Sequence, residues 1–80
     1  MHVEFQVCQV QTGRVTFVNN EWVGRVAPSV ANQDAAYDSC PREADYLNAA
    51  GESGWILVSV LPRFAVENDV HFLYLQRIRG

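Results

Sequence analysis

The sequence contains no lysine: its six basic residues are all arginines, and they face nine acidic residues for a net charge of −3. Nonspecific binding to nucleic acid depends on cations that neutralise phosphates, so this balance argues against a nucleic-acid partner. Arginine pairs with phosphate and carboxylate through a rigid two-pronged donor, so binding of a small anionic ligand stays possible. GC-rich codon usage is the simpler explanation of the missing lysine.

Cysteine and histidine are also scarce, with only Cys8, Cys40, His2 and His71 in the chain. Structural zinc sites usually pair their ligands at short spacing, and these four residues are scattered. We therefore expect no metal site and no cofactor. One disulfide is possible, but nothing indicates secretion and cytosolic thiols stay reduced, so a redox role for the cysteines is left open.

Long apolar runs are absent as well. No stretch approaches the ~20 residues that span a bilayer, and "MHVEFQVCQV" lacks the basic flank and apolar block of a signal peptide. We expect a cytoplasmic chain with no membrane contact, folded as a single domain over residues 1–80. A chain of this size buries only about 60% of its unfolded surface, so its core is thin and a homo-oligomer is expected.

The first 26 residues predict a three-stranded meander. In residues 2–10, Val3, Phe5 and Val7 share one face while polar residues and Cys8 share the other, the alternation of a half-buried strand. Strands at 14–18 and 22–26 follow, separated by turns at 12–13 and 19–21 in which Asn and Gly tolerate left-handed conformations. A glycine inside the third strand, Gly24, indicates a bulge or a close backbone approach.

One helix is expected in the second half. Residues 27–39 predict a long loop, with a short helical turn at 33–37, and a loop of this length is either mobile or functional. The helix is predicted from about Cys40, with Pro41 in its first turn, to Gly51 as a left-handed C-terminal residue.

Two further strands complete the predicted fold. The segment 55–61, "WILVSVL", is apolar on both faces except for Ser59, which predicts the central strand. A connection over 62–69 has Asn68 and Asp69 as turn residues, and the last strand covers 70–78. The order β-β-β-α-β-β predicts an α+β fold, an antiparallel sheet of about five strands with one short helix packed on one face.

The stretch "LNAAGESGWILVSV" (Leu47 to Val60) holds two glycines that could suggest a ligand loop. Phosphate-binding loops lie between a strand and the start of a helix, and here the predicted order is helix, glycines, strand. We therefore interpret it as a structural joint. Gly51 stops the helix at positive φ, Gly54 allows a close turn, and Trp55 anchors the joint in the core.

This block, with the closing "YLQRI", resembles a bacterial and phage family of short domains of unknown function that carry a short helix, a G-x-x-G-W-[E]-L-V strand and a last strand ending in Lys or Arg. The resemblance covers residues 44 to 79, and Ile56 stands where the family has Glu. It implies the fold and assigns no catalytic residue. It also suggests a phage or bacterial accessory role, for example inhibition of a host-defence protein or sequestration of a nucleotide signal.

Candidate binding residues are aromatic and arginine side chains that could stack on a ring or pair with a phosphate. Trp22 and Arg25 lie on the third predicted strand, and Tyr74 and Arg77 lie on the last. If these strands border one groove, a small anionic or nucleotide ligand could bind there. The alternative is that Trp22 packs in the core or in a dimer interface.

Nucleophilic chemistry is a third possibility. Cys40 near a helix start would have a lowered pKa, and His71 could serve as its base. A small buried thiol at the start of an apolar helical face is the commoner situation, so we predict a non-enzymatic binding or self-assembly module that acts on a partner protein or on its own copy. The alternative is a binder of a small anionic ligand, and a cysteine-based enzyme is the third choice.

Overall fold

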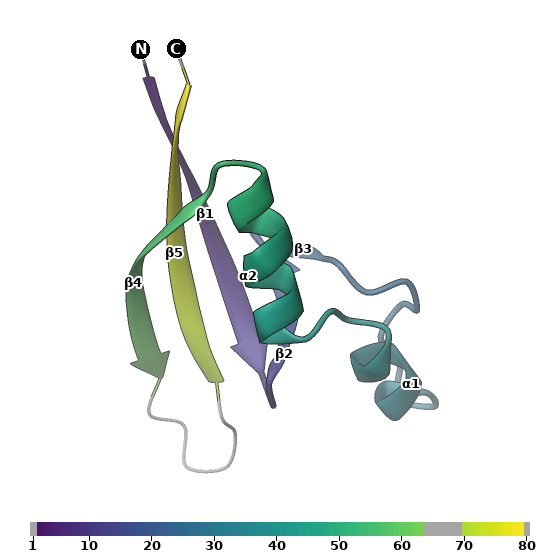
Figure 1. Ribbon diagram of the computed structural model, residues 1–80. Helices are drawn as coiled ribbons and strands as arrows, with labels where there is room; N and C mark the ends of the chain where they lie inside the picture. Colours follow the sequence, from purple (N-terminus) through teal and green to yellow (C-terminus); the bar gives the residue numbers. More distant parts are fainter. Residues whose placement is uncertain (1, 64–69, 80) are drawn as a thin grey trace.

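A computed structural model describes residues 2–63 and 70–79, so the predicted turn at Asn68 and Asp69 lies outside the described residues. The elements in chain order are β1 (His2–Gln11), β2 (Arg14–Val18), β3 (Glu21–Trp22), α1 (Gln33–Asp38), α2 (Glu43–Glu52), β4 (Ile56–Arg63) and β5 (Val70–Arg79). Figure 1 shows α2 lying across one face of the sheet and α1 beside its β2–β3 end. The α+β class is confirmed, and the short helical turn expected at 33–37 is the second helix, α1.

The strands form one antiparallel sheet in the order β3-β2-β1-β5-β4. The predicted meander is confirmed as β1-β2-β3, although β3 is shorter than expected. Its two turns use left-handed residues, with φ of +50° and +78° at Thr12 and Gly13 and of +51° and +70° at Asn19 and Asn20. Two-residue turns of positive φ match the twist of antiparallel strands, which is why these short polar segments reverse the chain.

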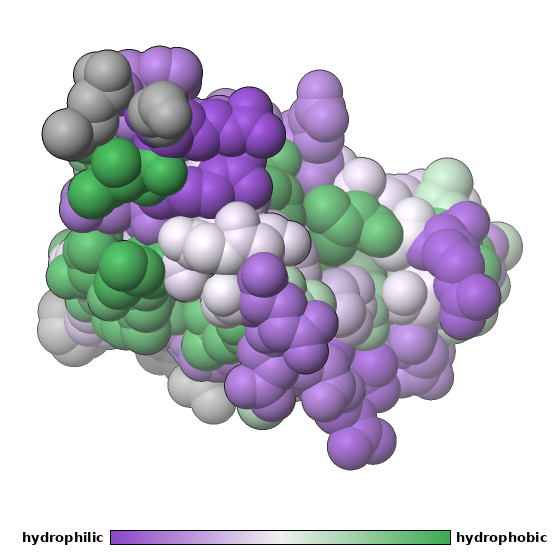
Figure 2. Space-filling model, turned by 45° about the horizontal axis from the view of Figure 1, so that its top comes forward, coloured by the Kyte–Doolittle hydropathy of each residue, from purple (hydrophilic) through white to green (hydrophobic). Residues whose placement is uncertain are grey.

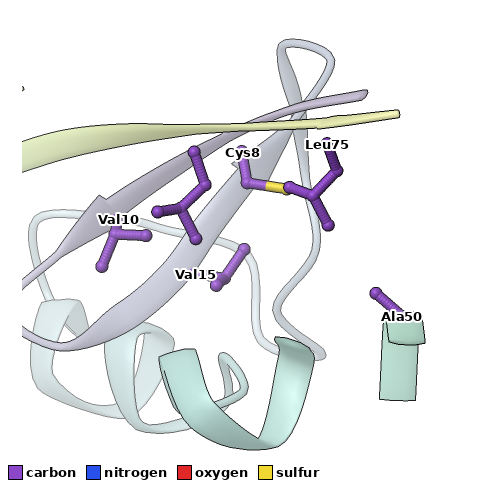
Figure 3. Close-up of a cluster of buried hydrophobic side chains, with 6 residues drawn as sticks. Cys8, Val10, Val15, Ala50 and Leu75 are labelled. Carbon is purple, nitrogen blue, oxygen red and sulfur yellow. The ribbon is translucent and has the colours of Figure 1, made fainter. Parts of the chain in front are cut away.

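The core lies between the sheet and α2, and it is small. Its buried members come from β1, β2, α2 and β5: Cys8, Val10, Val15, Ala50, Leu73 and Leu75. Figure 3 shows side chains of this cluster from the strands, with Ala50 on the helix. Among the described residues no aromatic side chain is fully buried. Aromatic side chains usually supply much of the buried area of a core, so this layer alone leaves much of the apolar surface uncovered.

The predicted helix start at Cys40 is wrong because the next residues are tied to the sheet. The Val15 amide donates to the Pro41 carbonyl at 2.9 Å, and the Glu43 amide donates to the Gly13 carbonyl at 3.0 Å. Between them Arg42 is extended, with φ −67° and ψ 149°, and forms a bridge to Arg14. The helix therefore begins only at Glu43.

The end of α2 also differs from the prediction. Gly51 lies inside the helix, and the positive φ falls on Gly54, at +89°. The Trp55 amide then donates to the Ala50 carbonyl at 3.0 Å, and the Gly54 amide donates to Gly51 at 3.0 Å. Trp55 packs against the core. The joint itself is as predicted, but the second glycine makes the left-handed turn.

The prediction that "WILVSVL" is the central strand is wrong. β4 pairs only with β5 among the described strands and stands at one edge of the sheet, while β1 and β5 occupy the interior. All ten residues of β1 pair with all ten of β5, so β5 lies between β1 and β4. Apolar residues on both faces indicate burial of both faces, and they do not tell whether both edges are paired. An apolar strand therefore lies at an open edge.

Candidate functional site

The sheet has two faces of different character, which the strand register distinguishes. Residues directly opposite each other in an antiparallel pair share a face, and neighbours along a strand alternate. Cys8 lies opposite Leu73 and both belong to the core under α2, so they mark the helix face. The alternating residues, such as Phe5, lie on the opposite face, which we call the open face.

The charged side chains of β1 and β5 lie on the helix face. Glu4 lies opposite Arg77, and its Oε1 accepts from Arg77 Nε at 3.2 Å and from Arg77 Nη2 at 3.1 Å. Arg79 Nε forms an ion pair with the same oxygen at 3.2 Å. The Arg77 guanidinium also lies 4.3 Å from the centre of the Trp55 ring and donates to the Ser53 carbonyl. This network therefore fastens the end of α2 to the sheet.

The open face of β1, β5 and β4 is apolar and accessible. Its most exposed side chains are Val3 (42%), Phe5 (64%), Ile56 (60%), Leu61 (53%) and Ile78 (58%). Val3 lies opposite Ile78, whereas Gln76 lies between Phe5 and Ile56, so the exposed apolar side chains share one face with polar side chains between some of them. Together they expose roughly 500 Å², at the upper end of the ~300–600 Å² of the largest patch on a typical monomer.

The predicted alternation in residues 2–10 is confirmed. An apolar face made of Val3, Phe5 and Val7 would be expected to pack against the helix. The structure has the reverse arrangement at this end, where the polar face of β1 lies on the α2 side and Val3 and Phe5 are exposed. The reason is that the C-terminal half of β1 supplies Cys8 and Val10 to the core, and a strand has only one alternation along its length. The open face is the functional candidate that sequence reasoning missed.

The apolar surface continues around the edge strand. On the helix face of β4, Leu57 and Val60 are 42% and 50% exposed, and Val58, at the bulge between Leu57 and Ser59, is 49% exposed. Figure 2 shows hydrophobic residues in green gathered at the left of the view, the side on which β4 lies. α2 therefore does not cover the far edge of the sheet.

Trp22 and Arg25, two of the predicted ligand residues, lie at the β3 end of the molecule. Trp22 packs edge-on against Phe17 and Tyr37, with ring centres 5.4 and 6.1 Å away, and its Nε1 donates to the Val26 carbonyl at 2.9 Å. Arg25 is exposed in the following segment. Trp22 therefore packs within the fold, which is close to the alternative given for it in the sequence analysis.

Gly24 explains how this corner closes. A Cβ at Gly24 would lie 2.6 Å from Ser39 Oγ, 2.8 Å from Trp22 Nε1 and 2.9 Å from Cys40 Sγ. Of the two predictions for Gly24, a bulge or a close backbone approach, the structure has the second: side chains closely approach its backbone, just beyond the end of β3. The Ser39 hydroxyl in turn accepts from the Val26 amide at 3.1 Å and donates to the Ala36 carbonyl at 2.6 Å, so α1 is held against the strand end.

Tyr74 and Arg77, the other two predicted ligand residues, do not share a site with Trp22. Arg77 lies on the helix face, paired with Glu4, whereas Tyr74 lies opposite Val7 and Ser59 on the open face. β1 and β2 separate β5 from β3 in the sheet. The four residues are not brought together into one groove.

Cys40 and His71 have different partners in the described structure. The Cys40 thiol is 2% exposed and donates to the Ala36 carbonyl at 3.6 Å, and burial raises its pKa, with the Arg14 charge lowering it by a smaller amount. The expected low pKa is therefore wrong, because Cys40 precedes the helix start and is enclosed. His71 Nε2 lies 3.0 Å from Glu43 Oε2.

Cys8 is also a buried free thiol. It donates to Gln6 Oε1 at 3.3 Å, and the Tyr46 hydroxyl donates to the same oxygen. Burial raises the pKa of Cys8 and raises that of Tyr46 far above its ordinary value. Both groups stay protonated at neutral pH, which suits a packed polar contact between α2 and the sheet.

Hollows in the described surface lie around α1. One of about 470 Å³ is lined by Gln11, Thr12, Asp34, Tyr37 and Asp38, and another of about 260 Å³ is lined by Pro28, Ser29, Val30, Gln33, Ala36 and Tyr37. Neither includes Trp22 or an arginine, and the larger one carries two carboxylates. Such a lining disfavours an anionic ligand.

Comparison with protein-family models, curated proteins and solved structures gives no match. The resemblance of Leu47 to Val60 to a bacterial and phage family therefore stays a prediction. Within residues 2–63 and 70–79 no helix has the length and apolar character needed to cross a bilayer, and no cluster of three metal-binding side chains is found.

Proposed function

We propose that this chain is a non-enzymatic protein-binding module whose binding surface is the open face of β1, β5 and β4. The observation that carries the proposal is the exposure of Val3, Phe5, Ile56, Leu61 and Ile78 on the same face of the sheet. Contiguous apolar patches of this size mark interaction sites on proteins. No comparable support exists for the alternative ligand site, since Trp22, Tyr74 and Arg77 lie apart.

The small core supports the same proposal. An 80-residue chain buries only a small core, and here the buried cluster holds one cysteine, one alanine and four larger aliphatic residues. β4 has the composition of a strand covered on both faces and lies at an edge. A partner that covers the open face would complete the missing layer.

Native mass spectrometry of freshly purified protein tests this function. We expect a mass above the 9.0 kDa of one chain, raised by further polypeptide rather than by a small ligand. A Phe5→Glu variant should lose the added mass, because Phe5 is the most exposed member of the open face. A bare monomer, or a retained small anion that survives Phe5→Glu, would contradict the proposal.

A further inference from the structure

We propose that the partner of the open face is the same face of a second copy, so that two chains pack sheet against sheet about a two-fold axis. This inference rests on the proposed function and names its partner. Two-fold dimers bury the same patch on both subunits, and face-to-face sheets pack about 10 Å apart with their side chains interdigitated. The requirement is a flat, apolar and self-compatible face.

The charge distribution favours a second copy. From the Val3–Ile78 pair to the Phe72–Leu61 pair, the open-face positions of β1, β5 and β4 hold no charged residue, and their polar members are Gln9, Ser59, Tyr74 and Gln76. Beyond them, the last β4–β5 pair on this face is Arg63 with Val70. The charges of β1 and β5 at this end, Glu4, Arg77 and Arg79, lie on the other face and pair with one another. The part of the face that holds the exposed apolar side chains therefore offers no charge to a charged partner. It also lets two chains of net charge −3 meet without like charges in contact.

The size of the face fits a dimer. The five most exposed side chains contribute roughly 500 Å². The partly exposed Val7, Phe72 and Tyr74 lie on the same face, with Phe72 beside Leu61 and with Val7 and Tyr74 in the next row. The whole face therefore approaches the ~800 Å² that each partner contributes to a stable interface of standard size.

Pairing of two β4 edges is the competing arrangement, and the edge itself disfavours it. β4 carries a bulge between Leu57 and Ser59 and a proline at Pro62. Bulges and prolines are devices that keep an edge strand from pairing with another chain. The bulge and the proline obstruct the edge, so we place the contact on the open face.

Adjacent residues of β4 give a matched test of this geometry. Ile56 lies on the open face and is 60% exposed, while Leu57 lies on the helix face and is 42% exposed. Sedimentation equilibrium over a dilution series should show a dimer for the wild type. Ile56→Glu should weaken dimerisation at least ~100-fold, because it would place a carboxylate in an apolar interface, and Leu57→Glu should change it less than ~5-fold.

The outcomes separate the two proposals. If the wild-type chain sediments as a monomer at ~100 μM, the proposal that a second copy is the partner is wrong. The proposed function then stands only if native mass spectrometry finds a different polypeptide, lost in Phe5→Glu. Equal weakening by Ile56→Glu and Leu57→Glu overturns the face-to-face geometry in favour of the edge. Circular dichroism checks the fold of each variant, and Phe5→Glu on β1 replaces Ile56→Glu if that variant does not fold.

Discussion

Replacing Gly51 and Gly54 by alanine, one at a time, should change the stability of the protein in opposite directions. Gly51 lies in α2 at an ordinary helical φ, and a Cβ there would meet no atom within 4 Å. Alanine in such a position stabilises a helix by about 0.5–1 kcal/mol, because glycine loses more backbone freedom on folding. Gly51→Ala should therefore raise the free energy of unfolding.

Gly54 has a φ of +89°, in the left-handed region. A Cβ there would lie 3.5 Å from Arg77 Cδ, an ordinary contact, so the cost comes from the backbone. Left-handed conformation costs an L-residue other than glycine about 1–2 kcal/mol. Gly54→Ala should lower the free energy of unfolding by this amount, and Gly54→Asn should lower it less, because Asn tolerates the left-handed region.

The two alanine variants should differ by about 2 kcal/mol, which corresponds to roughly 8–16 °C in melting temperature for a domain of this size. Thermal unfolding followed by circular dichroism measures the difference. All samples need the same protein concentration, because assembly raises the melting temperature by mass action. Destabilisation by Gly51→Ala, or equal effects of Gly54→Ala and Gly54→Asn, would refute the assignment of the left-handed turn to Gly54.

Three further predictions concern the corner beside α1, the buried thiol and the interface. Gly24→Ala should lower the free energy of unfolding in urea by about 1–3 kcal/mol, because its Cβ would overlap Ser39 Oγ and Cys40 Sγ; an unchanged midpoint would show that this corner relaxes. Burial raises the pKa of Cys8 above 9.0 and that of Tyr46 above 10.0. The folded state therefore keeps protons that the unfolded state loses, and stability should stay level below about pH 9 and fall above it. Tyr46→Phe should make this alkaline fall shallower in urea titrations at about pH 8 and 10.5, and an identical fall would contradict the role of the hydroxyl. The dimer dissociation constant should change less than ~3-fold between ~0.05 and ~1 M NaCl in sedimentation equilibrium, because salt screens only charged contacts; strong weakening by salt would indicate an ionic interface.

Local sequence determined the turns and the approximate place of each element. Asn19 and Asn20 adopt the left-handed conformation that their residue type permits, and the alternation of residues 2–10 made β1 predictable. The close approach at Gly24 was predictable too, since a glycine inside a strand pattern leaves room for a neighbour. These are short-range properties, fixed by the covalent geometry and side chain of each residue.

The candidate site was only partly predictable. The apolar row of Val3 and Phe5 was visible in the sequence, but its exposure was not, because alternation defines two faces without telling which one a helix will cover. Trp22 and Arg77 were predicted as ligand residues because a tryptophan can stack on a ring and an arginine can pair with a phosphate. Both have partners within the fold, Trp22 with Tyr37 and Arg77 with Glu4, and such partners come from distant parts of the chain.

The tertiary structure decided what the sequence by itself left open: the place of each strand in the sheet and the start of α2. The composition of β4 determined that both its faces are apolar, and only the pairing of all ten residues of β5 with β1 put β4 at the edge. Likewise Pro41 permitted a helix start, and hydrogen bonds from β2 and its turn moved it to Glu43. Long-range pairing outweighs local preference because several backbone hydrogen bonds and a buried layer depend on it, whereas a local propensity contributes only a fraction of ~1 kcal/mol per residue.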